Sequence, residues 1–218
     1  MPSGCDPAMG VGDGGSASDA CMSSLADIQA RDLMDKYGER MGKRKLDAAV
    51  IAAVEDDGTD GMRGLVTVEV RLMERGRDLL SSEESEFALT RAVSSLGPKQ
   101  RKEYKDASVM DIANGLLSPD YVAVCSLSNL CVSHSVRRRG VAVRLCLEAE
   151  RVAREIFGFD EIYLRVEKSN IAALRLYEKR LGYLRAFDVT GATALRVDVN
   201  AGSFVEVNTD IAVLRKKI

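Results

Sequence analysis

A strand, a helix and a second strand follow one another over residues 121–167, and this pattern constrains the fold more than any other feature. Residues 121–132 and 161–167 have the apolar, β-branched character of strands. Residues 141–158 between them read as an amphipathic helix that ends at Gly158. The apolar face of this helix consists of Leu145, Ala149, Val152 and Ile156. We expect the two strands to be parallel neighbours in one sheet, joined by a right-handed crossover.

The segments around this unit predict further strands and one more helix. Residues 46–54 form an apolar run, residues 64–72 alternate, and the turn-forming sequence EDDGTDG lies between them, so two antiparallel strands are expected. One side of the second strand carries Val66, Val68, Val70 and Leu72. A helix is predicted over about 170–181, followed by two or three strands from residue 183 onward. This mixture predicts an α/β (α+β) fold.

Two segments differ from the rest in composition. Residues 1–23 contain five glycines, four serines and no lysine or arginine, which predicts a flexible tail. A helix is expected over about 25–41, directly after Ser24. Residues 74–119 are polar and contain two or three short helical patterns that begin at serines, so they are predicted to pack as a helical insertion. Residues 24–218 are expected to form a single domain.

Charge and cysteine content narrow the class of protein. The chain has a formal net charge of -2, but residues 121–218 carry 16 basic against 11 acidic residues, which favours an anionic partner for that half. No apolar run approaches the ~20 residues of a membrane span, so a soluble protein is expected. The five cysteines form no CxxC pair and no cluster with histidine, which predicts a reducing intracellular compartment and no metal site. Cys125, Cys131 and Cys146 lie in apolar segments and are expected to be buried and inert.

Three consecutive arginines stand where the helix over 141–158 begins. Arg137, Arg138 and Arg139 precede Gly140. A helix N-terminus carries partial positive charge and unpaired N–H groups, so cations are poorly placed there unless an anion joins them. Gly140 has no Cβ and would let backbone N–H groups approach a phosphate closely. A phosphate-binding loop and a solvated run of charge both fit this pattern.

A second motif lies on the helix predicted over 170–181. Asn170, Ala173 and Tyr177 recur at the spacing of one helix face. In one interpretation, Asn170 caps the helix and Tyr177 packs in the core with its hydroxyl tied off. In the other, the amide and the phenol face a ligand.

Together the two motifs resemble those of the GNAT superfamily of N-acetyltransferases. Residues 137–142 match the acetyl-CoA motif [QR]-x-x-G-x-[GA], and residues 170–183 match N-x-x-A-x-x-x-Y-x-K-x-G-[FY] with one extra residue before Gly182. The resemblance is strong over residues 121–190. Within the superfamily, the sequence resembles ribosomal-protein-alanine acetyltransferases and plastid members. It implies a central mixed, mostly antiparallel twisted sheet flanked by helices. The two parallel central strands would be splayed in a V.

The resemblance also implies a binding site for acetyl-CoA in that splay. Backbone groups at the end of the first strand would bind pantetheine, and the arginine loop with the helix start would hold the pyrophosphate. Asn170 would bind the cofactor arm, and Tyr177 would protonate the departing CoA thiolate. The implied cofactor-binding set is Leu130, Cys131, Val132, Arg137, Arg138, Arg139, Gly140, Val141, Ala142, Val143 and Asn170.

The resemblance leaves the general base open. Related N-terminal acetyltransferases often place a glutamate five residues before the motif asparagine, and this sequence has Arg165 there. Glu167 has the same strand parity as Arg165, so it could face the cleft as the base or lie in a solvated salt bridge. For His134, the only histidine, a surface position is favoured over the role of base.

The main hypothesis is an enzyme that transfers an acetyl group from acetyl-CoA to a primary amine of a protein or peptide, by direct attack in a ternary complex. An N-terminal α-amine is the favoured acceptor, and a lysine ε-amine is the alternative. The rival hypothesis is a catalytically weak or silent subunit that docks on a larger complex through residues 74–119. No nucleic-acid partner is expected. The plastid stroma is the expected location, with the cytoplasm as the alternative.

Overall fold

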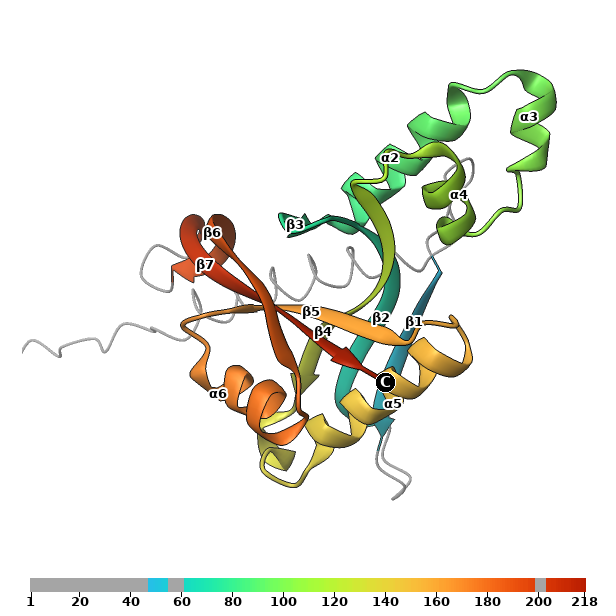
Figure 1. Cartoon of the computed structure of the whole chain (residues 1–218). Helices are drawn as coiled ribbons and strands as arrows, with labels where there is room; N and C mark the ends of the chain where they lie inside the picture. The colour runs from blue at the N-terminus through green and yellow to red at the C-terminus, as the bar shows by residue number, and fades with distance from the viewer. Residues whose placement is uncertain (1–46, 55–60, 199–202) are drawn as a thin grey trace, which may run out of the picture.

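A mixed sheet of seven strands forms the centre of the computed structural model, which describes residues 47–54, 61–198 and 203–218 (Figure 1). The strands lie in the order β1-β2-β4-β5-β7-β6, and β3 pairs with β2. The tail predicted for residues 1–23 and the helix predicted over 25–41 lie outside the described residues.

Along the described chain, β1–β3 come first, α2–α4 follow, the unit β4-α5-β5 comes next, and α6 precedes the last two strands. The strands are β1 (Ala48–Val54), β2 (Met62–Glu74), β3 (Asp78–Leu79), β4 (Tyr121–Val132), β5 (Glu161–Glu167), β6 (Leu184–Asp198) and β7 (Ser203–Lys217). The helices are α2 (Ser82–Ser94), α3 (Pro98–Glu103), α4 (Val109–Leu116), α5 (Val141–Glu155) and α6 (Ile171–Leu174), with a 3-10 turn at His134–Val136 and a π-helical turn at Arg175–Arg180. No described helix is long and apolar enough to cross a membrane.

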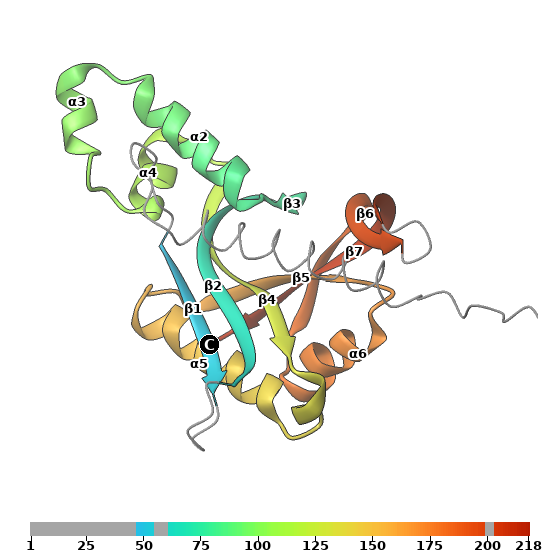
Figure 2. The same ribbon diagram turned by 180° about the vertical axis from the view of Figure 1, so that it is seen from behind.

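The pairing of β4 with β5 confirms the predicted parallel unit. Every other strand pair among the described residues is antiparallel, so the sheet is mixed and mostly antiparallel, as the resemblance implies. β4 and β5 share only three register pairs, the last of which joins Leu127 to Leu164. Beyond that point β4 continues to Val132 and β5 to Glu167 without pairing to each other. The C-terminal ends of the two strands lie apart in Figure 2, which confirms the expected splay.

Helix α5 covers the centre of one face of the sheet. It packs against β1, β2, β4 and β5, and three of the four residues expected on its apolar face are buried. The expectation for Ile156 was wrong. The helix ends at Glu155, and Ile156 is its C-cap with a side chain that is 63% exposed. Gly158 follows with φ +74°, the left-handed conformation common after a helix end.

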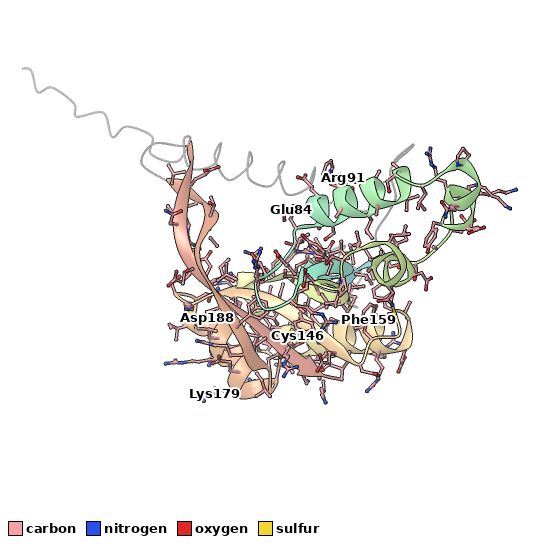
Figure 3. All side chains as sticks on the ribbon, turned by 45° about the horizontal axis from the view of Figure 1, so that its top comes forward. Glu84, Arg91, Cys146, Phe159, Lys179 and Asp188 are labelled. Atoms are coloured by element: carbon pink, nitrogen blue, oxygen red, sulfur yellow. The ribbon has the colours of Figure 1, made fainter. Side chains whose placement is uncertain are left out.

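Helices α2, α3 and α4 form the helical segment that the sequence predicts between residues 74 and 119. Ser81 caps α2 and Ser108 caps α4, each in a capping box with the acid three residues on, Glu84 or Asp111. Hydrogen bonds from Ser81 hold the pKa of the Glu84 carboxyl below its usual range. Glu84 lies near the start of α2, with Arg91 further along the same helix (Figure 3). The serines at the helix starts were therefore a correct signal.

The insertion and α5 share one row of side chains on β2. Val66 and Val68 belong to the core cluster that includes the buried face of α5. Val70 and Leu72, further along the same row, belong to a second cluster with residues of α2 and α4. This shared apolar row supports the proposal that residues 24–218 form a single domain.

Two long strands form the last part of the sheet, within the two or three expected from residue 183 onward. The first of them, β6, continues without a turn from Leu184 to Asp198. Gly191, with φ +68°, lies at a register shift within β6 rather than at a turn. Its N–H donates a hydrogen bond to Asp210 Oδ1 of β7 at 3.3 Å. By register, Val189 of β6 lies opposite Ile211, which pairs with Glu167 at the end of β5, so the part of β6 after Val189 extends beyond the end of β5.

Gly64 permits the close approach of β2 to β4 beside the splay. A Cβ at this position would lie 2.7 Å from the carbonyl oxygen of Cys131. We predict that Gly64→Ala lowers the free energy of unfolding by about 1–3 kcal/mol in urea denaturation, because the β4 backbone must shift. Gly97→Ser is the control, since its nearest heavy atom lies at 3.9 Å and serine is a favoured N-cap. Equal stability of Gly64→Ala and wild type would contradict a tight contact here.

Candidate functional site

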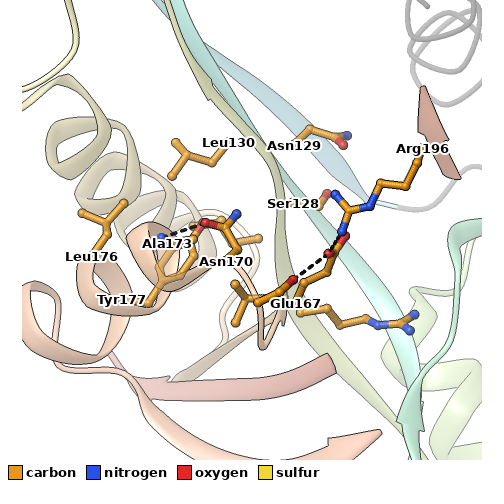
Figure 4. A pocket seen from close by; sticks show the side chains of 13 residues that line it. Ser128, Asn129, Leu130, Glu167, Asn170, Ala173, Leu176, Tyr177 and Arg196 are labelled. Carbon is orange, nitrogen blue, oxygen red and sulfur yellow. Dashed lines mark hydrogen bonds and ion pairs between the residues drawn. The ribbon is translucent and has the colours of Figure 1, made fainter. Parts of the chain in front are cut away.

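A cleft of about 520 Å³ lies where β4 and β5 separate (Figure 4). Its walls come from β4, β5, the helical segment after β5, and the far end of β6. It is lined by Leu127, Ser128, Asn129, Leu130, Arg165, Val166, Glu167, Ser169, Asn170, Ala173, Leu176, Tyr177 and Arg196. Because the facing strand edges are not paired beyond Leu127 and Leu164, their backbone groups are available to a ligand.

A bulge in β4 shapes one wall of the cleft. The register with β2 shifts between Leu65 and Thr67, and Asn129 opposite has φ +52°, which asparagine tolerates better than most residues. The Asn129 amide donates to Thr67 Oγ1 at 3.2 Å, and the hydroxyls of Thr67 and Ser128 are 2.7 Å apart. These contacts hold Ser128 and Asn129 in the wall. The sequence analysis assigned neither residue to the site, because a bulge has no distinct hydropathy pattern.

The three residues expected to bind the cofactor at the end of β4 do not all lie in the cleft lining. Leu130 lines the cleft, whereas Cys131 and Val132 do not. Cys131 is exposed, so the expectation of burial was wrong for this thiol. Cys125 and Cys146 are buried as expected, and burial raises the pKa of each thiol to about 12. Such thiols are inert at neutral pH.

The arginine loop joins the end of β4 to α5. Arg137, Arg138 and Arg139 are exposed, and none of them forms an ion pair with a carboxylate of the described residues. Arg137 Nε donates to the carbonyl oxygen of Val132 at 3.2 Å, which ties the loop to the strand. His134 is exposed, as expected, in the turn just before the arginines. The loop therefore presents positive charge beside the end of β4.

The start of α5 has the features of an anion-binding helix terminus. Gly140 is the N-cap with φ +80°, no side chain caps the helix, and its first turn contains no acid. A Cβ at Gly140 would meet nothing closer than Arg144 Nη1 at 3.9 Å, so the space above the glycine is open. The helix therefore presents the N–H groups of Val141, Ala142 and Val143 without side-chain partners.

Asn170 combines the two interpretations of its motif. It is the N-cap of α6, and its Oδ1 accepts a hydrogen bond from the Ala173 N–H at 3.1 Å, which confirms the capping role. The residue is also exposed and lines the cleft. Its Nδ2 has no hydrogen-bond partner among the described residues, so the amide can donate into the cleft while the oxygen caps the helix.

Tyr177 also lines the cleft, with its ring in the core. The residue is 7% exposed, and its ring meets that of Tyr183 edge-on, with centroids 5.7 Å apart. No described residue hydrogen-bonds to its hydroxyl, so the expectation of a tied-off phenol is not met. Burial raises the pKa of Tyr177 well above its ordinary value, with a smaller contribution from Cys146. The hydroxyl is therefore protonated at neutral pH.

The extra residue before Gly182 is absorbed by a wide helical turn. Residues Arg175–Arg180 form a π-helical turn, and the Leu181 N–H donates to the Leu176 carbonyl, five residues back, at 3.0 Å. A π-turn holds one more residue than an α-turn. Gly182, with φ +77°, still ends the helix directly before Tyr183. The extra residue before Gly182 thus leaves Asn170 and Ala173 in place on the first helical turn.

Glu167 faces the cleft and forms an ion pair there at the same time. Its Oε2 accepts hydrogen bonds from Arg196 of β6 and from Ser169 Oγ, the latter at 3.3 Å (Figure 4). Glu167 thus lines the cleft and lies in a partly exposed salt bridge, while its role as the base stays a prediction. Arg196 was missed by the sequence analysis, because only the sheet order brings β6 to this position.

Arg165 lines the cleft but is held on the side of the insertion. Its guanidinium lies 3.4 Å from Asp78 Oδ2 and donates to the Leu79 carbonyl at 3.4 Å, both on β3. It occupies the position at which related enzymes often carry a glutamate. At that position the chain has a cation bound to its own backbone rather than a base.

Sequence comparison relates the centre of this chain to known acetyltransferases. Residues 112–183 match the profile of the Acetyltransferase (GNAT) family. The chloroplastic GCN5-related N-acetyltransferase 6 of Arabidopsis thaliana is 40% identical over 53 residues, which is 24% of this chain and 18% of that protein. The catalytic subunit ard1 of the N-terminal acetyltransferase A complex of Schizosaccharomyces pombe is 37% identical over 65 residues, 30% of this chain and 34% of that protein. The matches thus span about a third or less of these relatives.

Among solved structures, Arabidopsis thaliana NAA60 in complex with acetyl-CoA aligns over 89% of this chain and 94% of its own, at 19% identity and a TM-score of 0.48. The ribosomal-protein-S18-alanine N-acetyltransferase of Escherichia coli aligns over 47% of this chain and 57% of its own, at 22% identity and a TM-score of 0.35. Identities and TM-scores this low say nothing of function, which must be inferred from the residues of the cleft.

The cap at Asn170 gives a prediction that separates its two roles. Asn170→Ala should lower the free energy of unfolding by about 1 kcal/mol in urea denaturation, because the Ala173 N–H loses its acceptor. Asn170→Asp is the matched control: it keeps a capping oxygen, so stability should stay within about 0.5 kcal/mol of wild type. A loss of stability in Asn170→Asp as large as that in Asn170→Ala would contradict the capping role.

Proposed function

We propose that this chain, whose residues 112–183 match the Acetyltransferase (GNAT) family, is a member of that family and transfers an acetyl group from acetyl-CoA to a primary amine of a protein or peptide. The observation that carries the proposal is the cleft between two parallel strands, with a buried and protonated phenol, Tyr177, in its wall. Reaction by direct attack in a ternary complex follows from this arrangement, because the described residues place no nucleophilic thiol in the cleft lining.

The loop and the strand end fit the two parts of the cofactor. The uncapped start of α5, the open space above Gly140 and three exposed arginines suit a pyrophosphate, which is anionic and needs N–H donors. The unpaired edges beyond Leu127 and Leu164 suit an amide-bearing arm such as pantetheine. In this proposal Leu130, Cys131 and Val132 contribute backbone groups. Asn170 contributes its free amide N–H.

Acetyl-CoA supplies the acetyl group as a thioester, and residues of this chain donate and accept the protons of the reaction. The departing sulfur needs a proton donor, and Tyr177 holds a proton on its hydroxyl at neutral pH. Glu167 is the carboxylate among the cleft-lining residues, so we assign to it the role of taking the proton from the amine. Its Oε1 has no partner among the described residues and is free to do so.

An N-terminal α-amine is the favoured acceptor. At pH 7 the removal of a proton costs about 4.6 kcal/mol for a lysine with a pKa near 10.4, but only about 1.4 kcal/mol for an α-amine with a pKa near 8. The single carboxylate in the cleft lining is already paired with Arg196, which favours the amine that loses its proton more easily. The relative ard1, the catalytic subunit of an N-terminal acetyltransferase complex, supports the same choice.

A catalytically silent binding subunit is the second candidate function. Arg165 at the position of the familiar glutamate favours it, as does the insertion α2–α4, which projects away from the sheet (Figure 1). In this alternative the insertion would dock on a larger complex. The discriminating experiment is incubation of the full chain with acetyl-CoA and a peptide library, with free thiol and acetylated amine measured together. Thiol release without an acetylated peptide, or neither, would favour the silent subunit.

A plastid location is proposed from the chloroplastic relative, with the cytoplasm as the alternative. The expected location is tested by imaging the full chain fused at its C-terminus to a fluorescent protein. Signal confined to the cytoplasm would contradict the plastid assignment.

Cofactor binding through the loop predicts the behaviour of a Gly140 variant. Acetyl-CoA at a hundred times its dissociation constant should stabilise wild type by about 2.7 kcal/mol, seen as a raised melting temperature. Gly140→Glu should abolish this shift, because its carboxylate would repel the phosphates and fill the open space above the loop. Gly97→Glu, which adds the same charge in the insertion, is the control and should keep the shift. An unchanged shift in Gly140→Glu would place the phosphates elsewhere.

Proton donation by Tyr177 predicts a kinetic defect without a binding defect. Tyr177→Phe should lower kcat by roughly tenfold to several hundredfold, while the affinity for acetyl-CoA measured by calorimetry stays similar. Tyr121→Phe, at the start of β4 and outside the cleft lining, serves as the matched control and should keep full activity. Full activity of Tyr177→Phe would mean that Tyr177 packs in the core and donates no proton in the reaction.

Amine choice predicts a pH dependence. At pH 7, peptides with a free N-terminus should be acetylated faster than peptides with a blocked N-terminus and one lysine, measured by mass spectrometry. Lysine acetylation, where present, should rise steeply between about pH 7 and 9, because the fraction of unprotonated lysine increases about tenfold per pH unit in that range. Preference for lysine at pH 7 would contradict the proposed acceptor.

A further inference from the structure

An ion pair between Glu167 and Arg196 joins β5 to β6 across the wall of the cleft. Both residues line the cleft, and their side chains are 26% and 49% exposed. Arg196 and Ser169 Oγ both donate to Oε2 of Glu167. Ser169 therefore keeps the carboxylate in place even when Arg196 moves, while Oε1 faces no described hydrogen-bond donor.

A proton taken up by Glu167 changes the charge balance of this pair. Once Glu167 is neutral, Arg196 is a cation in the cleft wall without a counter-charge, because no other described carboxylate lies within ion-pair distance of it. Arg165, the second cation in the lining, is already bound to Asp78 and to the Leu79 carbonyl. A carboxylate that arrived with the acceptor would restore the balance at Arg196.

We propose that the cleft selects acceptors with an acidic side chain close to the reactive amine, and that Arg196 recognises that side chain. This inference rests on the proposed acetyl transfer and specifies its substrate class. The substrate carboxylate pairs with Arg196, and Glu167 takes the proton that the amine loses. The amine nitrogen forms the N–C bond to the acetyl carbonyl as the C–S bond breaks. The sulfur receives the proton of Tyr177, so charge and protons balance over the reaction.

The exchange of partners at Arg196 is feasible because the existing pair is weakly held. Ion pairs with partly exposed side chains contribute little to stability, since water competes for both charges. Arg196 is half exposed and comes from a different strand than Glu167, so its side chain can turn to a new carboxylate without movement of β5. The planar fork of its guanidinium suits a bidentate carboxylate.

The test compares two peptides that differ only in the second residue, Ala-Glu and Ala-Gln at the N-terminus, with the full chain as enzyme. In wild type we expect kcat/KM to be about two- to fivefold higher for the acidic peptide, the size of effect that a single partly exposed ion pair gives. Arg196→Gln should bring the ratio of the two kcat/KM values close to one, because the cation that recognises the acidic side chain is then absent. Glu167→Gln should lower activity on both peptides by about a hundredfold or more.

Two further variants keep the result interpretable. Arg196→Lys retains the charge without the fork, so it should keep part of the preference. Arg185→Gln is the matched control: Arg185 lies on the same strand, is 43% exposed and pairs with Glu178 and Asp188 outside the cleft lining. It should keep the full preference. Melting temperatures of all variants establish that they are folded.

The possible outcomes separate the inference from the function on which it rests. Acetylation of both peptides without preference in wild type, or a preference that survives Arg196→Gln, would overturn the role of Arg196 and leave the transferase intact. No acetylation of either peptide would overturn the proposed function and this inference with it. A preference lost in Arg185→Gln as well would show that it reflects general surface charge, which also overturns the assignment.

Discussion

The short parallel pairing of β4 with β5 fixes the position of every residue in the site. The two strands separate after Leu127 and Leu164, yet each stays paired to its other neighbour, β4 with β2 as far as Val132 and β5 with β7 as far as Glu167. The splay is therefore not a frayed end, because both walls are held by complete ladders on their outer sides. The inner backbone groups are left for water or a ligand, since buried peptide groups rarely stay unpaired. Helix α5, which follows β4, begins at the arginine loop, and the helical segment after β5 carries Tyr177 in the cleft wall.

Much of the fold could be predicted from the sequence because its central elements have strong, regular patterns. The strands expected at 121–132 and 161–167 have those bounds in the structure, and the serines expected to start helices cap them. The failures lie where position depends on distant packing. Ile156 fits the helical period, but the helix ends one residue before it, so its side chain is exposed. Cys131 lies in an apolar run, but the end of β4 is a cleft edge rather than core.

The site was predictable only as far as local motifs reach. The loop from Arg137 to Gly140 and the helix start at Asn170 are contiguous in sequence, so their spacing alone indicated them. Arg196 reaches the cleft because β6 lies beside β7, which lies beside β5, and no local pattern encodes that order. The same holds for Ser128, which lies beside the bulge of β4. This bulge is defined only by the pairing of β4 with β2. The cleft residues that distant strands contribute are thus the ones that sequence motifs identify least well.

Polar contacts connect the cleft wall to the insertion. Thr67 and Ser128 share a hydrogen bond at the wall, and Arg71 donates to the Ser128 hydroxyl at 3.4 Å. Arg71 also pairs with Glu69, which is only 2% exposed and accepts a hydrogen bond from Ser82 Oγ at 2.9 Å.

Ser82 begins α2, so an unbroken chain of contacts runs from the cleft to the first turn of the insertion. On the other wall, Arg165 makes a second connection through β3, where it binds Asp78. Glu69 is a buried charge that requires its partners, so a shift of α2 that removed Ser82 would leave this carboxylate with one hydrogen-bond donor fewer. An insertion that only covered part of the surface would need neither the contact of Ser82 with Glu69 nor that of Asp78 with Arg165. The position of α2 is therefore linked through direct contacts to the cleft wall, which in the proposed reaction faces the acceptor amine.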